Sequence, residues 1–222
     1  MTTDSPTPDS FTPALGQPWL TPLYDLAIAA LTRESVWRKL LVRQINATPG
    51  DRILDVGCGT GSLAAMIARV APNAAIFGID PDPAVLEQAR KKAAAAGVSV
   101  QFVQGFLSEA ALSGLTPLTK ITSSLVFHQV PLGEKRRILD LMRGALAKGG
   151  ELHVADYGEQ RTPLSRWLFR RTVQSLDGFE NTQPNADGIL PVLMREVGFS
   201  RVEELHCIGA PTGSISLYRC VA

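Results

Sequence analysis

The chain has 222 residues, which is long enough for one α/β domain with a full core and short for two independent domains. Hydrophobic residues make up 45% of the chain, a share that excludes wholesale disorder. The formal net charge is only +1, so the chain lacks the global basic field that holds nucleic acid.

The first 47 residues divide into two parts. Residues 1–18 are rich in Thr, Ser and Pro, a composition that buries too little apolar surface to fold, so we expect a flexible tail. Residues 19–47 are expected to form an N-terminal helical lid with helices near 21–32 and 34–45. No basic patch precedes an apolar run here, so we expect no signal peptide and no membrane span.

From Asp51 onward, apolar strand patterns alternate with helical patterns, which predicts a parallel sheet covered on both faces. The expected strands are 52–56, 75–79, 98–103, 120–126 and 151–155, followed by a hairpin of 201–208 and 214–221. The expected helices are 62–70, 83–95, 133–147, 163–174 and 188–197. We therefore expect one domain over residues 19–222, with residues 158–198 supplying helices of a substrate pocket.

A glycine-rich turn follows the first of these strands, and a helix opens directly after it. Gly57, Gly59 and Gly61 leave bare backbone against which a ligand can lie, next to the unpaired N–H groups of a helix start. The spacing G-x-G-x-G differs from the G-x-G-x-x-G of dinucleotide binders. Asp55 before the turn would repel a pyrophosphate but suits a cationic amine or sulfonium, such as that of S-adenosylmethionine (SAM).

A second acid, Asp80, ends the next strand, beside the glycine turn. A carboxylate at this place can accept both hydroxyls of a ribose. The alternative role is a helix cap in front of Pro81, which is compatible with ribose binding.

These residues together resemble the class I SAM-dependent methyltransferases, and within that class the ubiquinone and menaquinone biosynthesis C-methyltransferases. The resemblance continues at 146–150, 155–158, 198–199 and 212–215. It implies a Rossmann-like sheet of seven mostly parallel strands, with helices on both faces and one antiparallel strand near the edge.

The resemblance also implies S-adenosyl-L-methionine as cofactor and a set of residues that hold it. Asp55, Gly57 and Thr60 are expected at the methionine end, with Ser124 nearby, and Asp80 at the ribose. Phe106 and Leu107 are expected to flank the adenine. The full cofactor set is Asp55, Gly57, Cys58, Gly59, Thr60, Gly61, Asp80, Pro81, Gly105, Phe106, Leu107 and Ser124.

Methyl transfer requires the acceptor in line with the sulfonium, beyond the carboxyl ends of the strands. His128 is the candidate base because imidazole titrates near neutral pH; its alternative role is that of a pocket wall. The other candidate acceptor-binding residues are Tyr24, Gln129, Asp156, Tyr157, Trp167 and Phe179. For Asp156 the alternative is a solvated or capping acid, and for Tyr24, Trp167 and Phe179 it is simple packing.

We expect no metal requirement, because no carboxylate follows the fourth strand at the place where cation-dependent O-methyltransferases have one. The three cysteines, Cys58, Cys207 and Cys220, have no disulfide or metal spacing and favour reduced thiols in the cytoplasm. The predicted function is methyl transfer to a small organic molecule, with no nucleic-acid partner. The alternatives are a nicotinamide-dependent oxidoreductase and a SAM-binding module without turnover. Oligomeric state is not encoded in any pattern that we find.

Overall fold

The computed structural model describes residues 32–222. The expected tail, most of the first helix of the lid, and Tyr24 therefore lie outside the described residues. Seventeen elements follow in chain order. They are α2 (Glu34–Ile45), β1 (Arg52–Val56), α3 (Ser62–Val70), β2 (Ala75–Asp80), α4 (Pro83–Ala95), β3 (Gln101–Gln104), α5 (Glu109–Leu112), β4 (Leu118–Ser124), the 3₁₀ turn η1 (Phe127–Gln129), α6 (Leu132–Ala145), β5 (Leu146–Tyr157), α7 (Pro163–Arg171), α8 (Val173–Asp177), α9 (Phe179–Ala186), α10 (Ile189–Glu196), β6 (Arg201–Ala210) and β7 (Gly213–Val221).

One seven-stranded sheet organises the chain, in the order β3-β2-β1-β4-β5-β7-β6. The strands from β3 to β5 pair in parallel, and β7 pairs antiparallel with both β5 and β6. The expected Rossmann-like architecture, its single antiparallel strand and the closing hairpin are confirmed. The strand order reverses between β1 and β4, which is where open α/β sheets bind their ligands.

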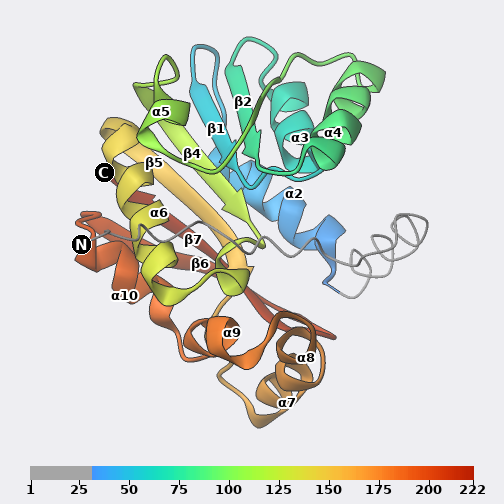
Figure 1. Cartoon of the computed structure of the whole chain (residues 1–222), viewed down its shortest axis with the longest axis vertical. Coiled ribbons are helices and arrows are strands. Elements are labelled where there is room, and N and C mark those ends of the chain that lie inside the picture. The colour runs from blue at the N-terminus through green and yellow to red at the C-terminus, as the bar shows by residue number, and fades with distance from the viewer. Residues whose placement is uncertain (1–31) are drawn as a thin grey trace, which may run out of the picture.

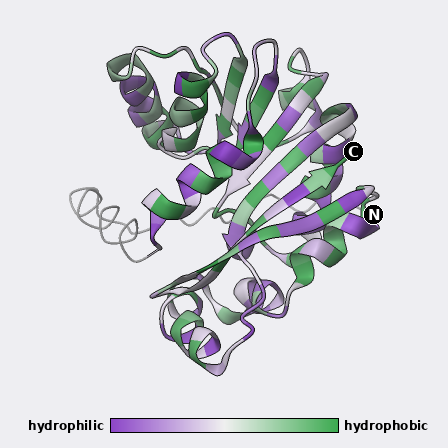
Figure 2. Cartoon of the chain, turned by 180° about the vertical axis from the view of Figure 1, so that it is seen from behind, coloured by the Kyte–Doolittle hydropathy of each residue, from purple (hydrophilic) through white to green (hydrophobic). Residues whose placement is uncertain are grey.

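Consecutive strand residues point to opposite faces of the sheet, and this alternation builds two cores. Ile53 packs with α2 and α3, through residues such as Trp37 and Ile67. Its neighbour Leu54 packs with α6 and α10, through residues such as Leu139. Figure 1 shows these helices on the two sides of the sheet. In Figure 2 the edge strand β6 carries several hydrophilic residues; its sequence includes Arg201, Glu203, Glu204 and His206.

Three short helices, α7 to α9, form a separate lobe (residues 163–186) beyond the carboxyl end of β5 (Figure 1). A capping box starts α7: Thr162 accepts from the backbone N–H of Ser165, whose hydroxyl accepts from that of Thr162. The helix predicted over 163–174 is divided at Thr172, and α9 was not predicted at all. Gly178, with φ of 82°, separates α8 from α9.

The prediction was also wrong at several strand ends near the candidate site. β4 ends at Ser124 instead of 126, and the chain turns into η1. β5 begins at Leu146 instead of 151, because Leu146 already pairs with Leu118 before an irregular step in the register. The predicted helix over 133–147 accordingly ends at Ala145.

Candidate active site

The glycine turn after β1 is held tightly against β2 and β4. The backbone N–H groups of Gly57 and Cys58 both donate to the Ile79 carbonyl, at 2.9 and 3.1 Å. Gly57, Gly59 and Gly61 all have positive φ, the region that favours glycine. A Cβ on Gly57 would lie 2.3 Å from Cγ2 of Val126, so backbone and neighbouring side chain both require glycine there.

Asp80, at the end of β2, faces this turn. Its Oδ2 accepts from the Gly59 N–H at 2.9 Å, and its Oδ1 accepts from the Asp82 N–H at 3.0 Å. The cap of α4 is Asp82, which accepts from the Ala84 N–H, so the alternative role of Asp80 as that cap is wrong. Burial raises the pKa of Asp80 despite these two hydrogen bonds. A carboxylate offers about four lone-pair positions, so two remain for a ligand.

Asp55 lies inside the sheet below the turn and is only 1% exposed. Neither of its carboxylate oxygens has a hydrogen-bond partner among the described residues. Burial raises its pKa to about 7, although the nearby Arg38 acts in the opposite direction. A buried carboxylate without partners is costly, and it is relieved by a cation placed beside it.

Arg38 of α2 is the cation closest in effect to Asp55, and sequence reasoning had not given it a role. Burial lowers the pKa of its guanidinium, while Glu34 and Asp55 raise it. The group pairs with Glu34 and lies 5.3 Å from the centre of the Trp37 ring, and its Nε has no hydrogen-bond partner. The carboxyl group of Asp55 and the guanidinium of Arg38 therefore lie near each other at the methionine end of the predicted cofactor site, each with unused hydrogen-bonding capacity.

The remaining predicted cofactor residues differ in their exposure. Phe106 is 63% exposed after β3, whereas Leu107 is buried in the core with Phe77 and Ile79. The Thr60 hydroxyl accepts from Lys92 Nζ at 2.8 Å. Four further positions lie at the same edge of the sheet, in the turn, at the end of a strand or just after one: Cys58, Ser124, Pro81 and Gly105. Burial raises the pKa of the Cys58 thiol, so it stays protonated at neutral pH.

Asp156, near the end of β5, organises the neighbouring turn η1. Its carboxylate is fully buried and accepts from the backbone N–H groups of Val126, Phe127, His128 and Tyr157, at 2.9, 2.7, 3.3 and 2.8 Å. The alternative of a solvated acid is therefore wrong, because the residue is an internal anion held by main chain. Leu125, which enters this turn, has the strained φ of 55°.

The same carboxylate holds His128. Asp156 Oδ1 lies 2.8 Å from His128 Nδ1, and Asp177 Oδ2 of α8 lies 3.5 Å from His128 Nε2. The imidazole is 3% exposed, and its ring meets that of Tyr157 edge-on with centroids 5.0 Å apart. Burial alone would lower the pKa of His128, but Asp156 and Asp177 outweigh it and raise the pKa to about 9. In this conformation His128 is an imidazolium at neutral pH.

Three further residues complete this network, of which Lys135 and Asn185 had no predicted role. Lys135 of α6 is fully buried and donates from Nζ to the carbonyls of Phe127 and Asn181. Burial lowers its pKa to about 8, with Asp156 acting in the opposite direction. Asn181 donates to the Gln129 carbonyl at 3.0 Å, and Asn185 donates to the Tyr157 carbonyl at 3.0 Å. The lobe is thus tied to η1 and β5 by polar contacts.

The predicted acceptor residues separate into two groups. Gln129 and Tyr157 join the His128 network: Gln129 Nε2 lies 3.3 Å from His128 Nε2, and Tyr157 donates from its hydroxyl to Thr212 at 2.9 Å. Trp167 and Phe179 do not, since they are 56% and 60% exposed on the lobe.

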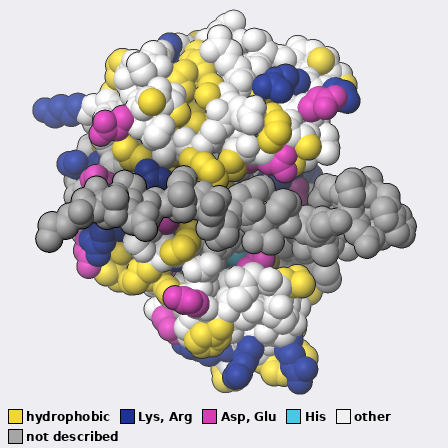
Figure 3. Space-filling view, in the orientation of Figure 1, with side chains coloured by type: hydrophobic (Ala, Val, Ile, Leu, Met, Phe, Trp, Pro, Cys, Tyr) yellow, Lys and Arg dark blue, Asp and Glu magenta, His cyan; other side chains and the backbone are white. Residues whose placement is uncertain are grey.

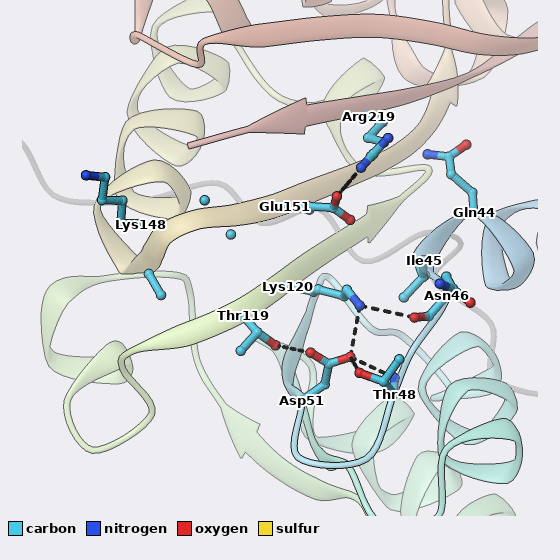
Figure 4. A pocket seen from close by; sticks show the side chains of 13 residues that line it. Gln44, Ile45, Asn46, Thr48, Asp51, Thr119, Lys120, Lys148, Glu151 and Arg219 are labelled. Atoms are coloured by element: carbon cyan, nitrogen blue, oxygen red, sulfur yellow. Dashed lines mark hydrogen bonds and ion pairs between the residues drawn. The ribbon is translucent and has the colours of Figure 1, made fainter.

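A cavity of about 470 Å³ lies at the opposite edge of the sheet (Figure 4). Four of its charged side chains form ion pairs: Asp51 accepts from Lys120 at 2.9 Å and from Thr119 at 2.7 Å, and Glu151 pairs with Arg219. These acids already have hydrogen-bond partners, unlike Asp55, and Asp80 keeps two free lone pairs. We therefore assign the ion pairs of this cavity to the stability of the sheet edge.

Two further surveys cover residues 32–222. No group of three or more His, Cys, Asp and Glu side chains in that range is arranged to hold a metal ion. No helix within it combines the length and the apolar content needed to cross a bilayer.

Comparison with known proteins adds relatives to this geometry. Residues 53–150 match the family model described as a methyltransferase domain. A protein-L-isoaspartate O-methyltransferase from Methylorubrum populi is 32% identical over 159 residues, which cover 72% of this chain and 68% of that protein. A ubiquinone/menaquinone biosynthesis C-methyltransferase from Syntrophotalea carbinolica is 29% identical, over 68% of this chain and 63% of that protein.

Other relatives carry different names. A ribosomal RNA small subunit methyltransferase C from Pseudomonas aeruginosa is 29% identical, over 75% of this chain and 53% of that protein. The crystal structure of magnesium protoporphyrin IX methyltransferase from Synechocystis, with bound SAH, has a TM-score of 0.62 and 17% identity, over 89% of this chain and 85% of that one. The chain spans about half to two thirds of the length of these three curated relatives.

Proposed function

Because this chain belongs to the class I SAM-dependent methyltransferases, we propose that it transfers a methyl group from SAM to a small organic molecule. The observation that carries the proposal is the buried carboxylate of Asp55, without a hydrogen-bond partner, below the glycine turn and next to Asp80. Family membership decides against the nicotinamide-dependent alternative, whose pyrophosphate an acid at this place would repel.

The described residues fit SAM in charge and in hydrogen-bonding capacity. Asp55 and Arg38 together match the ammonium and carboxylate of an amino acid, and each has hydrogen-bonding capacity left over. Asp80 retains lone pairs for a pair of ribose hydroxyls, and Phe106 offers an exposed ring for a base. When bound, SAM would supply a methyl group to a nucleophile, with the thioether of S-adenosylhomocysteine as the leaving group.

His128 is the residue that we assign to the acceptor. Asp156 fixes the ring through Nδ1, so Nε2 is the atom that can meet an acceptor. In the described conformation Asp177 lies at that atom, and the imidazolium has no free lone pair. We infer that the acceptor replaces Asp177. Removing this carboxylate lowers the pKa of His128, so the Nε2 proton passes to solvent, and the neutral ring then takes the proton that the acceptor loses on methylation.

The enclosure of His128 supports a small acceptor. The ring is 3% exposed and is covered by α8 and α9, so an RNA or a folded protein would reach it only after the lobe opened. The net charge of +1 favours the same conclusion. The three cysteines are free thiols, which supports the cytoplasm as the compartment.

Two experiments test the proposal. Titration calorimetry with S-adenosylhomocysteine should give binding to the wild type and at least tenfold weaker binding to Asp80→Asn. Asp82→Asn is the matched control, because Asn caps helices as well as Asp. A well-folded wild type that takes up neither this compound nor SAM would refute the function.

The second experiment concerns turnover. Labelled SAM is incubated with a panel of small phenols, carboxylic acids, amines and quinols. His128→Ala should lose at least 100-fold in methyl transfer while its affinity for S-adenosylhomocysteine is unchanged. Unchanged turnover in that variant would remove His128 from the mechanism without affecting the cofactor site.

A further inference from the structure

The outer surface of the lobe carries large apolar side chains in water. Leu164 and Trp167 of α7 are 65% and 56% exposed, and Leu176 of α8 is 64% exposed. The opposite face of α7 is anchored, since Phe169 is 1% exposed and Ser165 belongs to the capping box. The helix is therefore fixed in a position that presents Leu164 and Trp167, three residues apart, to the outside.

Helix α7 also carries three arginines beside these apolar side chains. Arg166, Arg170 and Arg171 are all exposed, and residues 162–176 contain no acid, so this segment has a local charge of +3 in a chain whose net charge is +1. The Arg171 guanidinium lies 5.8 Å from the centre of the Trp167 ring. Within residues 32–222, Arg170 and Arg171 have no ion pair, and Arg166 has only a 3.4 Å contact with Asp187. Figure 3 shows dark blue and yellow side chains side by side at the lower tip of the molecule.

A groove of about 260 Å³ adjoins this face, between α7, α8 and α9. Arg166 and Arg170 line it together with Phe169 and Phe179. It therefore joins two guanidinium groups to an apolar wall. A phosphate with a hydrocarbon chain attached to it is complementary: the phosphate suits the two guanidinium groups, and the chain suits the apolar wall.

We propose that this basic apolar face, comprising Leu164, Arg166, Trp167, Arg170, Arg171 and Leu176, docks the protein on the surface of an anionic lipid bilayer. Trp and Leu enter the boundary between headgroups and acyl chains, and arginines alongside pair with lipid phosphates. RNA would use the arginines but would gain nothing from Leu164 and Leu176. The acids of the lobe, Asp177 and Glu180, follow residue 176 in the chain, and Asp187, just after the lobe, contacts Arg166 at 3.4 Å. The inference goes beyond the proposed methyl transfer and does not depend on it.

Sedimentation of the full chain with vesicles tests the proposal, at about 0.1 M salt so that surface charges are not screened out. Vesicles of phosphatidylcholine with roughly one third phosphatidylglycerol should bind the protein, and pure phosphatidylcholine should bind it at least tenfold less. The triple variant Arg166→Gln/Arg170→Gln/Arg171→Gln should lose at least tenfold in binding to the anionic vesicles. Arg69→Gln/Lys91→Gln/Arg201→Gln removes the same charge from exposed sites on other elements and should bind like the wild type.

The apolar part has its own readout. Leu164→Ser/Leu176→Ser should bind at least fivefold more weakly, and the fluorescence of Trp167 should shift to the blue with vesicles, because its ring leaves water. Thermal melting checks that each variant is folded. Failure of the anionic vesicles to bind wild-type protein, equal loss in the two triple variants, or arginine-dependent binding to a single-stranded RNA without vesicle binding would each overturn the proposal.

Discussion

Replacing Asp55 by Asn should stabilise the protein without ligand and weaken SAM binding at the same time. Asp55 has an ordinary pKa of 3.8 and a folded-state pKa of about 7, because burial opposes its charge. The folded state therefore holds the proton more tightly than the unfolded state does. The stability contributed by the neutral acid is fully present below pH 3.8, and it is lost as the pH rises to about 7.

The interval from 3.8 to about 7 corresponds to about 4 kcal/mol at pH 8. Since Asp55 is 1% exposed, solvent screens little of this cost. An amide buried in the same place costs about 2 kcal/mol of its own, so the net gain expected for Asp55→Asn is about 2 kcal/mol. For a chain of this length that gain raises the melting temperature by about 4–8 °C.

Thermal or urea unfolding between pH 4 and 8, with and without SAM, measures both effects. Near pH 4, where Asp55 of the wild type is neutral, only the cost of the amide remains, so Asp55→Asn should be less stable than the wild type by up to about 2 kcal/mol; by pH 8 it should be about 2 kcal/mol more stable. Its stabilisation by SAM should be largely lost. Asp51→Asn, at the position just before the same strand, is the matched control with opposite sign. Burial of Asp51 acts to raise its pKa, but hydrogen bonds from Lys120, Thr48 and Thr119 outweigh it and lower the pKa to about 2, so that variant should lose stability. An Asp55→Asn variant that melts below the wild type at pH 8 would refute the reasoning.

Three further predictions concern the His128 network and the turn. Asp177→Asn should lower the pKa of His128, followed by NMR of the ring, while Asp187→Asn, just after the lobe, leaves it unchanged. A pKa that stays near 9 in Asp177→Asn would contradict the assignment. Asp156→Asn should lower the free energy of unfolding by about 3 kcal/mol in urea, because it disturbs four backbone hydrogen bonds and leaves Lys135 without its nearby carboxylate. It should also reduce methyl transfer at least 100-fold. A variant as stable as the wild type would show that the turn does not depend on this carboxylate. Gly57→Ala should lose about 2 kcal/mol of stability and the binding of S-adenosylhomocysteine, since its Cβ would meet Val126 at 2.3 Å. The control Gly133→Ala in α6, where a Cβ meets open space, should be slightly more stable than the wild type. Equal melting temperatures of the two variants would show that the turn can shift.

The parts of the fold that local patterns specify were predictable. α3 and α4 match their predicted bounds, since each starts at a clear signal: the glycine turn in front of Ser62, and Asp82 with Pro83. The seven-stranded sheet and its hairpin followed from the alternation of patterns and from the family resemblance. The start of β5 was not predictable. Gly149 and Gly150 indicate a helix end, whereas the pairing of Leu146 with Leu118 depends on a neighbouring strand of the sheet.

The partners in the His128 network could not be read from the sequence. Asp177 is 49 positions from His128, in a five-residue helix that packing, not local propensity, maintains. α9 contains Pro184, which argues against a helix in any local reading. Lys135 is flanked by Glu134, Arg136 and Arg137 and looks like part of a solvated face, whereas tertiary structure buries it completely. Its burial is visible only once the carbonyls of Phe127 and Asn181 are seen to converge on it.

The strand order separates the two parts of the proposed site along the sheet. Asp55 and Asp80 stand on β1 and β2, and the His128 network stands beyond β4 and β5, on the far side of the reversal in strand order. The matched methyltransferase domain ends at residue 150, so it includes His128, whereas the lobe that covers His128 follows it. If the proposed assignment holds, substitutions in residues 163–186 change the surroundings of the acceptor and leave the residues proposed to hold the methyl donor untouched.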